Sequence, residues 1–280
     1  APTVISLFAG CGGSSLGYSM AGYRELLAVE WNDNAVETFK LNFPNIPIYH
    51  NDIAKLSVDE CLQIADIKPG DLDILDGSPP CQGFSTAGKR ILADDRNQLF
   101  REFVRLLQGL QPKVFVMENV SGLVKGKMKL IFAEIIRELK ASGYRVRCKK
   151  LNTMYFNVPQ SRDRLIFIGI RNDLEIEPSY PISQNVFTVI DAIEHCSDKG
   201  KPLTKEASKY WPRKKPGESA SKYQPKGHLF GLIKVNPVKP CPTLTKAAGA
   251  SKHTRWDIPR FIGIKERARI GGYHDGFLFV

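Results

Sequence analysis

The stretch Val4-Ile-Ser-Leu-Phe-Ala-Gly-Cys-Gly-Gly13 joins an apolar, β-branched run to a glycine-rich turn, and a helical pattern through Leu16 and Met20 follows it. A buried strand that leads into such a turn and then into a helix is the first unit of an α/β fold. The same alternation continues as far as Ile170. We expect further strands at 26–30, 46–49, 72–76, 114–118, 144–151 and 164–170, and helices near 33–43, 97–110 and 128–139.

Strands that alternate with helices predict an α/β fold with a Rossmann-like, doubly wound and mostly parallel sheet. The strands at 144–151 and 164–170 lie too close in sequence for a crossover helix. We therefore expect them to be antiparallel neighbours, which makes the last strand antiparallel. The basic region that follows is rich in proline and predicts a small irregular second domain.

Polar and glycine residues follow five of the predicted strands, at the edge where this architecture binds ligands. They are Gly10 to Gly13, Glu30, Asp52, Pro79-Pro80-Cys81 and Glu118-Asn119. Because the carboxyl ends of parallel strands meet at one edge of a sheet, we expect these residues to line a common rim.

The first part of this rim is typical of a nucleoside site. Gly10-x-Gly12 follows a strand, and Glu30, twenty residues beyond Gly10, can accept protons from ribose hydroxyls. Ser15 stands where a dinucleotide fingerprint has glycine, which disfavours a pyrophosphate cofactor. Trp31 is placed either against an adenine or in the core, and Asp52 either accepts from an adenine amine or caps a helix.

The second part of the rim points to nucleophilic chemistry. Two prolines fix the backbone before Cys81, and a thiol acts as a nucleophile only as the thiolate. Glu118 supplies a carboxyl group at the end of the neighbouring strand. Gln160, Arg162 and Arg164 alternate along the chain, so we expect them to share one face of a strand.

The positive charge of the 280-residue chain, +11 in total, is concentrated in residues 199–260. That segment has 15 Lys and Arg against Glu206, Glu218 and Asp257, which is +12, so the remainder sums to −1. Such concentration favours a polyanion-binding face, with a merely solvated loop region as the alternative. The six cysteines are scattered, which disfavours a disulfide framework and a metal site and indicates an intracellular protein. The longest apolar runs are too short for a membrane helix.

Five blocks in order identify a family resemblance. They are Phe-Ala-Gly-Cys-Gly-Gly13, Pro-Pro-Cys-Gln-Gly-Phe-Ser85, Glu-Asn-Val120, Gln-x-Arg-x-Arg164 and Arg260 to Phe277. Together they resemble the cytosine carbon-5 DNA methyltransferases, which use S-adenosyl-L-methionine, and the resemblance extends from Val4 to Phe277. It implies methyl transfer to a flipped-out cytosine in a duplex DNA site, through a covalent adduct with Cys81.

The resemblance also assigns roles to individual residues. The catalytic set is Cys81, Glu118, Arg162 and Arg164. The cofactor set is Phe8, Gly10, Gly12, Gly13, Glu30, Trp31, Asp52, Ile53, Pro80 and Leu99. The DNA set is Gln82, Ser85, Thr243 and Thr245, and no metal is implied.

The resemblance implies three regions: a catalytic domain at 1–180, a target-recognition domain at 181–260 and a return segment at 261–280 that packs between them. We expect the protein to act as a monomer on double-stranded DNA. We expect a prokaryotic modification enzyme of a restriction-modification system, in the cytoplasm with the nucleoid, or a nuclear location if the source is eukaryotic.

The family carries a further block, Gly-Asn-x-Val-Pro, that does not occur before Val280. We expect a longer chain to supply it, or else a separate polypeptide. The second case gives the main alternative, a DNA-binding subunit that is inactive without its partner. A transfer RNA methyltransferase is a third reading, which Gln82-Gly-Phe-Ser85 disfavours, and a nicotinamide oxidoreductase is the least favoured.

Overall fold

In the computed structural model of the chain, the described residues are 1–80, 98–126, 128–198, 200–224, 229, 231–245 and 253–280, and they divide into two units. Unit 1 comprises Ala1–Leu151, Arg164–Tyr180 and Leu278–Val280. Unit 2 comprises Asn152–Asp163 and Pro181–Phe277. The chain therefore enters unit 2 twice.

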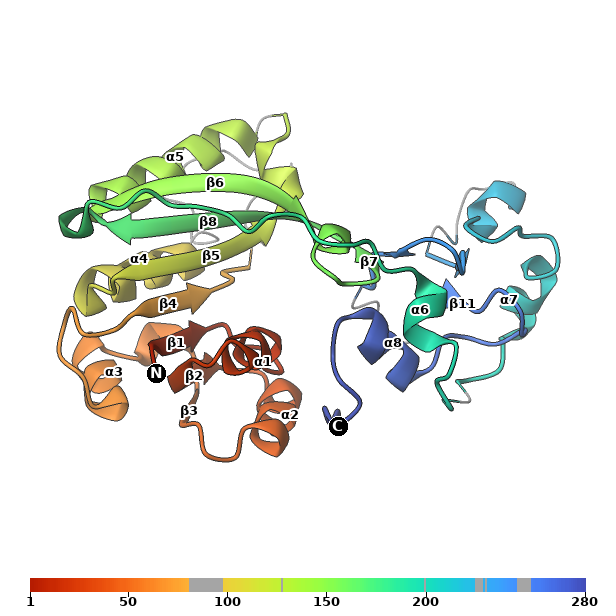
Figure 1. Cartoon of the computed structure of the whole chain (residues 1–280), viewed down its shortest axis with the longest axis horizontal. Helices are drawn as coiled ribbons and strands as arrows, with labels where there is room; N and C mark the ends of the chain where they lie inside the picture. Colours follow the sequence, from red (N-terminus) through yellow and green to blue (C-terminus); the bar gives the residue numbers. More distant parts are fainter. Residues whose placement is uncertain (81–97, 127, 199, 225–228, 230, 246–252) are drawn as a thin grey trace. The chain divides into compact units, whose positions relative to one another are not determined.

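Unit 1 is built on a seven-stranded sheet in the order β3-β2-β1-β4-β5-β8-β6, which Figure 1 shows from β3 at one end to β6 at the other. Its strands are β1 (Thr3–Leu7), β2 (Arg24–Glu30), β3 (Ile48–His50), β4 (Ile74–Gly77), β5 (Val114–Val120), β6 (Tyr144–Asn152) and β8 (Asp163–Arg171). The pairs among β1 to β5 are parallel, and β8 runs antiparallel to β5. The predicted fold class, with an antiparallel last strand beside its predecessor, is confirmed.

Five α-helices connect these strands: α1 (Gly13–Met20), α2 (Asp33–Asn42), α3 (Val58–Ala65), α4 (Gln98–Leu110) and α5 (Met128–Ala141). The predicted strands and helices of this unit lie within two residues of the observed ones. Helix α3 was not predicted. Ser57 caps it by accepting a hydrogen bond from the Glu60 amide at 3.1 Å, a Ser-x-x-Glu signature that the sequence does contain. Short 3-10 turns are η1 (Ile53–Lys55), η3 (Ser121–Val124) and η5 (Asn172–Leu174).

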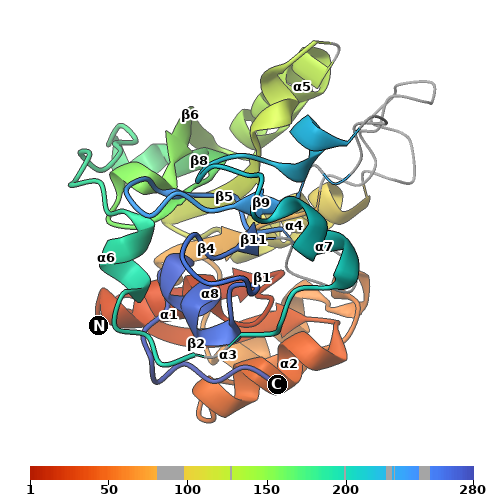
Figure 2. The same ribbon diagram turned by 90° about the vertical axis from the view of Figure 1, so that its right-hand side faces the viewer.

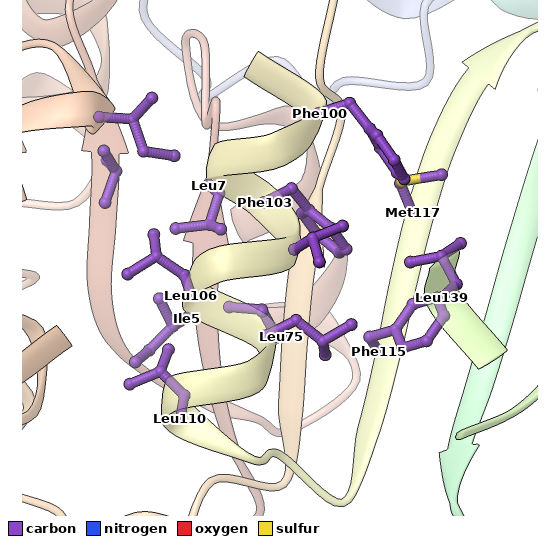
Figure 3. Packing of buried hydrophobic residues seen from close by; sticks show 14 of the residues in the cluster. Ile5, Leu7, Leu75, Phe100, Phe103, Leu106, Leu110, Phe115, Met117 and Leu139 are labelled. Carbon is purple, nitrogen blue, oxygen red and sulfur yellow. The ribbon is translucent and has the colours of Figure 1, made fainter. Parts of the chain in front are cut away.

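The main core lies between the sheet and helices α3, α4 and α5. Helix α4 buries residues at helical spacing, so that one face of it is apolar along its whole length. Figure 3 shows Phe103, Leu106 and Leu110 of α4 directed at Leu7, Leu75 and Phe115 of the sheet. This packing fixes the strands whose ends carry the site.

The opposite face of the sheet is covered by α1 and α2 and is more polar. Side chains alternate along a strand, so Val4 and Ser6 face away from the core to which Ile5 and Leu7 belong. Ser6 lies beside Asp76 of β4 in the sheet register, and both are buried. Helix α1 thus rests on a sheet face with buried polar groups.

Unit 2 has little regular structure. Its elements are η4 (Thr153–Tyr155), β7 (Gln160–Ser161), α6 (Val189–Ile193), α7 (Lys205–Tyr210), η6 (Ala220–Tyr223), β9 (Ile233–Lys234), β10 (Cys241–Pro242), β11 (His253–Thr254) and α8 (Ile264–Ile270). Strand β10 pairs with β7, and β11 pairs with β9. Helices α6 and α8 are in contact, and Val189, Ile193 and Ile270 belong to one buried cluster. Figure 2 shows the two helices side by side.

Candidate active site

The glycine loop between β1 and α1 has an unusual backbone. Phe8, Gly10 and Gly12 all have positive φ, at 57°, 57° and 92°. Positive φ is uncommon for a bulky residue such as Phe8 and is often found at functional sites. Beside Gly10 there is no atom within 4 Å of where a Cβ would lie, so the loop leaves open space next to its backbone.

Glu30, at the end of β2, joins this loop to the start of α2. One carboxylate oxygen accepts from the Gly10 amide at 2.8 Å, and the other accepts from the Trp31 and Asn32 amides, both at 2.9 Å. A carboxylate has about four acceptor positions, so three backbone bonds leave room for a further donor. Glu30 therefore holds the loop and can still meet a ligand hydroxyl.

The next three predicted cofactor residues follow the ends of β2 and β3. Trp31 is 74% exposed, so the core-packing alternative for it is wrong. Asp52 is exposed and caps η1 by accepting from the Ala54 amide at 3.0 Å. Ile53 is buried in the main core and anchors that turn. The Trp31 ring and the Asp52 carboxylate are thus both accessible.

The end of β4 is held by close packing. A Cβ on Gly77 would lie 2.9 Å from the Phe103 ring, so only glycine fits against α4 here. Asn119 of β5 is buried and donates to the Pro79 carbonyl at 3.5 Å, which ties the proline pair to the neighbouring strand. Pro80 is exposed, and Leu99 in the first turn of α4 packs on the main core. Cys81, Gln82 and Ser85 lie outside the described residues.

Glu118 and Arg164 form an ion pair on the sheet. In the β5–β8 register Glu118 lies opposite Ile166 and Val120 opposite Arg164, so the two charged side chains are diagonal neighbours on one face. Their side chains are only 30% and 20% exposed, which limits screening by solvent. The structure thus joins two of the four predicted catalytic residues.

The other predicted arginine lies elsewhere. Arg162 falls between β7 and β8 and belongs to unit 2, whereas Arg164 belongs to unit 1. The prediction that Gln160, Arg162 and Arg164 share one face of a strand is therefore wrong. The physical reason is that β7 pairs with β10, not with the strands beside β8, and that the Arg162 amide donates to the Asn152 side-chain Oδ1 at 3.1 Å.

Gln160, Thr243 and Thr245 lie close together in unit 2. Gln160 is buried and accepts from the Leu244 amide at 3.2 Å. Thr243 donates its hydroxyl to the Ser161 carbonyl at 2.8 Å, which leaves its oxygen as an acceptor only. Thr245 is exposed.

Some cations of the basic segment are buried in unit 2, where they contact other residues of that unit. Lys214 is 2% exposed and donates to the Leu232 carbonyl at 3.0 Å. Lys234 lies 3.7 Å from the centre of the Trp211 ring, and Arg255 is buried beside Glu266. Burial, with the nearby charge of Lys234, lowers the pKa of Lys214 to about 8. Among the described residues of the segment, the exposed cations are Lys201, Lys205, Lys209, Arg213, Lys215, Lys222 and Lys239.

The profile of the C-5 cytosine-specific DNA methylases matches residues 2–280. The chain belongs to this family. Among the described residues, no group of three His, Cys, Asp or Glu side chains is placed to hold a metal ion, and no helix is long and apolar enough to cross a membrane.

Two of the relatives to which the chain is similar are bacterial Type II methyltransferases. The Type II methyltransferase M1.HphI of Haemophilus parahaemolyticus is 45% identical over 196 residues, which are 69% of this chain and 52% of that protein. M.Sau96I of Staphylococcus aureus is 32% identical over 302 residues, 99% of this chain and 69% of that protein. The chain thus spans about half the length of the first of these relatives.

Solved structures agree with the fold of the family. One similar structure is that of a protein encoded in a prophage of E. coli, which is described as a putative DNA modification methyltransferase. It has a TM-score of 0.81 and 25% identity, covering 100% of this chain and 90% of that one. The Dnmt2 methyltransferase of S. pombe has a TM-score of 0.69 at 18% identity, covering 100% and 88%. At that identity the likeness shows the fold alone.

One buried acid of this methylase chain was missed in the sequence. Asp76 is the third residue of β4 and is 7% exposed. Central parallel strands are normally apolar throughout. An acidic residue inside such a strand, just before Gly77, is therefore the sequence feature that could have indicated a functional role. Its surroundings are taken up below.

Proposed function

We propose that the protein transfers a methyl group from S-adenosylmethionine to carbon 5 of a cytosine in duplex DNA. The observation that carries this proposal is the Glu118–Arg164 pair in a C-5 cytosine methylase. Glu118 lies on β5, which is next to β4, the strand that leads to Pro79-Pro80-Cys81, and Arg164 lies on β8, on the other side of β5. Such a pair offers a carboxyl group and a fixed guanidinium to the polar edge of a pyrimidine. Cys81 supplies the nucleophile.

The chemical steps assign a separate task to each residue. The Cys81 thiolate adds to carbon 6 of cytosine, which makes carbon 5 electron-rich enough to take a methyl group. Glu118 shares a proton with ring N3 and so offsets the negative charge that develops during addition. Arg164 donates to the O2 atom of the base and, through its ion pair, keeps Glu118 in place. Carbon 5 takes the methyl group and S-adenosylhomocysteine is left. Loss of the carbon 5 proton to water then breaks the bond to carbon 6 and releases the Cys81 thiolate.

The residues on the rim fit the methyl donor. S-adenosylmethionine, when bound, supplies an electrophilic methyl group on a sulfonium. Glu30 retains acceptor capacity for ribose hydroxyls, Trp31 is exposed for stacking, and Asp52 is exposed for an exocyclic amine. The open space beside Gly10 allows close approach to the backbone.

We also propose that the cytosine is flipped out of the duplex and that unit 2 carries target recognition. A stacked base exposes neither face of its ring to a thiolate, so the base must leave the helix. The exposed cations from Lys201 to Lys215 can neutralise phosphates, whereas buried Lys214 and Arg255 cannot. Type II relatives further suggest a role in restriction-modification.

Bisulfite sequencing of DNA from cells that express the full-length protein tests this function. We expect one short sequence to be protected at a single cytosine. A duplex with 5-fluorocytosine at that position should then trap a covalent adduct in the presence of cofactor, because the fluorine cannot be lost as a proton is.

The matched variants for this test are two cysteine substitutions. Cys81→Ser should abolish both protection and adduct, while Cys148→Ser, a half-buried thiol of β6, should abolish neither. Folded wild-type protein that protects no cytosine, or Cys81→Ser that still protects it, would contradict the proposal.

Gly12→Ala is expected to weaken donor binding. Its Cβ would lie 2.5 Å from the Phe43 ring and 3.1 Å from the Phe39 ring, at a φ of +92°. Left-handed backbone costs an alanine about 1–2 kcal/mol, and the ring must also shift. A loop displacement that costs about 1.4 kcal/mol of binding raises the dissociation constant about tenfold, which is the effect we expect.

Isothermal titration with S-adenosylhomocysteine measures this change. Gly17→Ala in α1 is the control, since no atom lies within 4 Å of its Cβ position. That variant should bind as tightly as wild type. Equal affinity in Gly12→Ala would show that the loop does not need its left-handed conformation for binding.

A further inference from the structure

A buried carboxyl group lies under helix α1, on the strand that leads to the nucleophile. Asp76 belongs to β4 and lies opposite Ser6 of β1 in the sheet register. Its side chain is thus on the sheet face that α1 covers, away from Leu75 and the main core. The next residue, Gly77, is the one locked against Phe103.

Both hydrogen-bond donors to Asp76 come from α1. The Tyr18 hydroxyl donates to Asp76 Oδ1 at 3.3 Å, and the Ser14 side chain is also hydrogen-bonded to the carboxyl group. Ser14 and Tyr18 are one helical turn apart, so they lie on the same side of α1. Ser14 follows Gly12, the N-cap of this helix, by two residues. Asp76 therefore connects β4 directly to the first turns after the glycine loop.

The groups that face Asp76 are mostly acidic. Glu25 of β2 and Glu118 of β5 both act on it electrostatically, and Tyr18 packs edge-to-face on Tyr23 at 5.4 Å. Glu25 itself is held by a hydrogen bond from Ser15 at 3.0 Å, and burial raises its pKa.

This environment decides the charge state of Asp76 near neutral pH. Burial raises its pKa to about 7; the hydrogen bonds from Ser14 and Tyr18 lower it, while Glu25 and Glu118 raise it. Ionised and protonated forms are therefore both present between pH 6 and 8. Only the ionised form accepts two charge-assisted hydrogen bonds from α1.

We propose that Asp76 is a positioning residue, which in its ionised form holds α1 and the glycine loop in place relative to the strand that leads to Cys81. This rests on the proposed function, because the loop is the donor site and β4 leads to the nucleophile. This role requires no contact of Asp76 with substrate or donor. Asp76 acts through Ser14 and Tyr18.

The pH dependence of donor binding tests this role with the full-length protein. We expect the dissociation constant of S-adenosylhomocysteine, measured without DNA, to fall about fivefold for wild type from pH 6 to pH 8. Asp76→Asn keeps the shape of the side chain but cannot ionise. Its dissociation constant should stay near the pH 6 value of wild type throughout.

Two further variants separate positioning from a general loss of stability. Tyr18→Phe removes one donor and should reduce the pH-dependent change even if Asp76→Asn fails to fold. Asp73→Asn is the control: Asp73 lies just before β4, where it accepts from Thr3 at 2.7 Å and Lys113 at 2.7 Å. It should lose stability yet keep the wild-type pH profile.

The outcomes distinguish this inference from the proposed function. A wild-type pH profile in Asp76→Asn, or in Tyr18→Phe if the first variant does not fold, overturns the role of Asp76, even if the protein methylates DNA. Wild-type protein that binds the donor analogue but transfers no methyl group overturns the function alone. Wild-type protein that binds no S-adenosylhomocysteine overturns both.

Discussion

Glu118→Gln is expected to lower kcat for DNA methylation by about 10²–10⁴-fold, the usual contribution of a positioned proton-transfer group. Glutamine keeps the length and shape of the side chain and can still accept from Arg164. It cannot share a proton with ring N3, so the charge that develops when Cys81 adds is no longer offset. At pH 8, where Asp76 is largely ionised with or without the charge of Glu118, we expect the dissociation constant of the donor to stay unchanged.

The partner of Glu118 provides the next comparison. Arg164→Lys keeps the positive charge but loses the planar fork that meets a carboxylate and a base oxygen together. Because the two residues are in contact, the double variant Glu118→Gln/Arg164→Lys should lose less activity than the product of the single losses. Single-turnover methylation with saturating donor measures these rates directly.

A control for ion-pair loss in general comes from α4. Glu102 pairs with Arg105 at 2.6 Å in the same unit, outside the proposed site. Glu102→Gln should leave kcat within about twofold, since a partly exposed ion pair contributes about 0–1 kcal/mol. A Glu118→Gln variant that matched this control would remove Glu118 from the catalytic set.

The parts of the fold that the sequence predicts are those dominated by burial. Strands such as Val114–Val120 are short apolar runs bounded by turn residues, and α4 repeats apolar side chains at helical spacing, so burial and local pattern agree. Helix α3 was missed although its capping signature at Ser57 was present, and it is no shorter than α1, which was predicted. Local patterns predict elements well when tertiary contacts reinforce them.

The site was less predictable where partners are distant in sequence. The alternation at Gln160 to Arg164 looks like one strand. Residues 160 and 161 instead pair with β10, which lies some eighty residues later in the chain. Charge counting likewise cannot tell exposed Lys215 from buried Lys214, because the burial of Lys214 depends on its contact with Leu232, a residue 18 positions later. Asp76 has a role only through Tyr18 and Ser14, which no local pattern links to it.

The other large expected effect concerns the stability of unit 2. Glu266 of α8 is fully buried and accepts from the Gly263 amide at 2.8 Å, from Arg255 at 2.5 Å and from Arg260 at 2.7 Å. Glu266→Ala would remove the carboxylate that pairs with the largely buried guanidinium groups of Arg255 and Arg260. Breaking a buried ion pair by removing one partner costs about 3–5 kcal/mol, and we expect a loss of that size for unit 2.

The pH dependence of this stability follows from the same contacts. Burial raises the pKa of Glu266, but hydrogen bonds from Arg260, Gly263 and Arg255 outweigh it and lower the pKa below its usual 4.5. A lowered acid pKa contributes stability above about pH 4.5 that is lost as the pH falls below it. Wild-type unit 2 should therefore weaken in acid more steeply than Glu266→Ala does.

Tryptophan fluorescence can follow unit 2 alone during urea unfolding. Trp211 donates to the Arg255 carbonyl at 3.0 Å, and Trp256 lies 4.4 Å from the Arg255 guanidinium, so both rings report on the region around Glu266. A Trp31→Phe background removes the third tryptophan, which is in unit 1. Asp275→Ala is the matched control, because its ion pair with Arg269 at 2.7 Å is exposed and contributes at most about 1 kcal/mol. If Glu266→Ala shifted the midpoint no further than Asp275→Ala does, the buried carboxylate would not be what holds the two arginines in the folded unit.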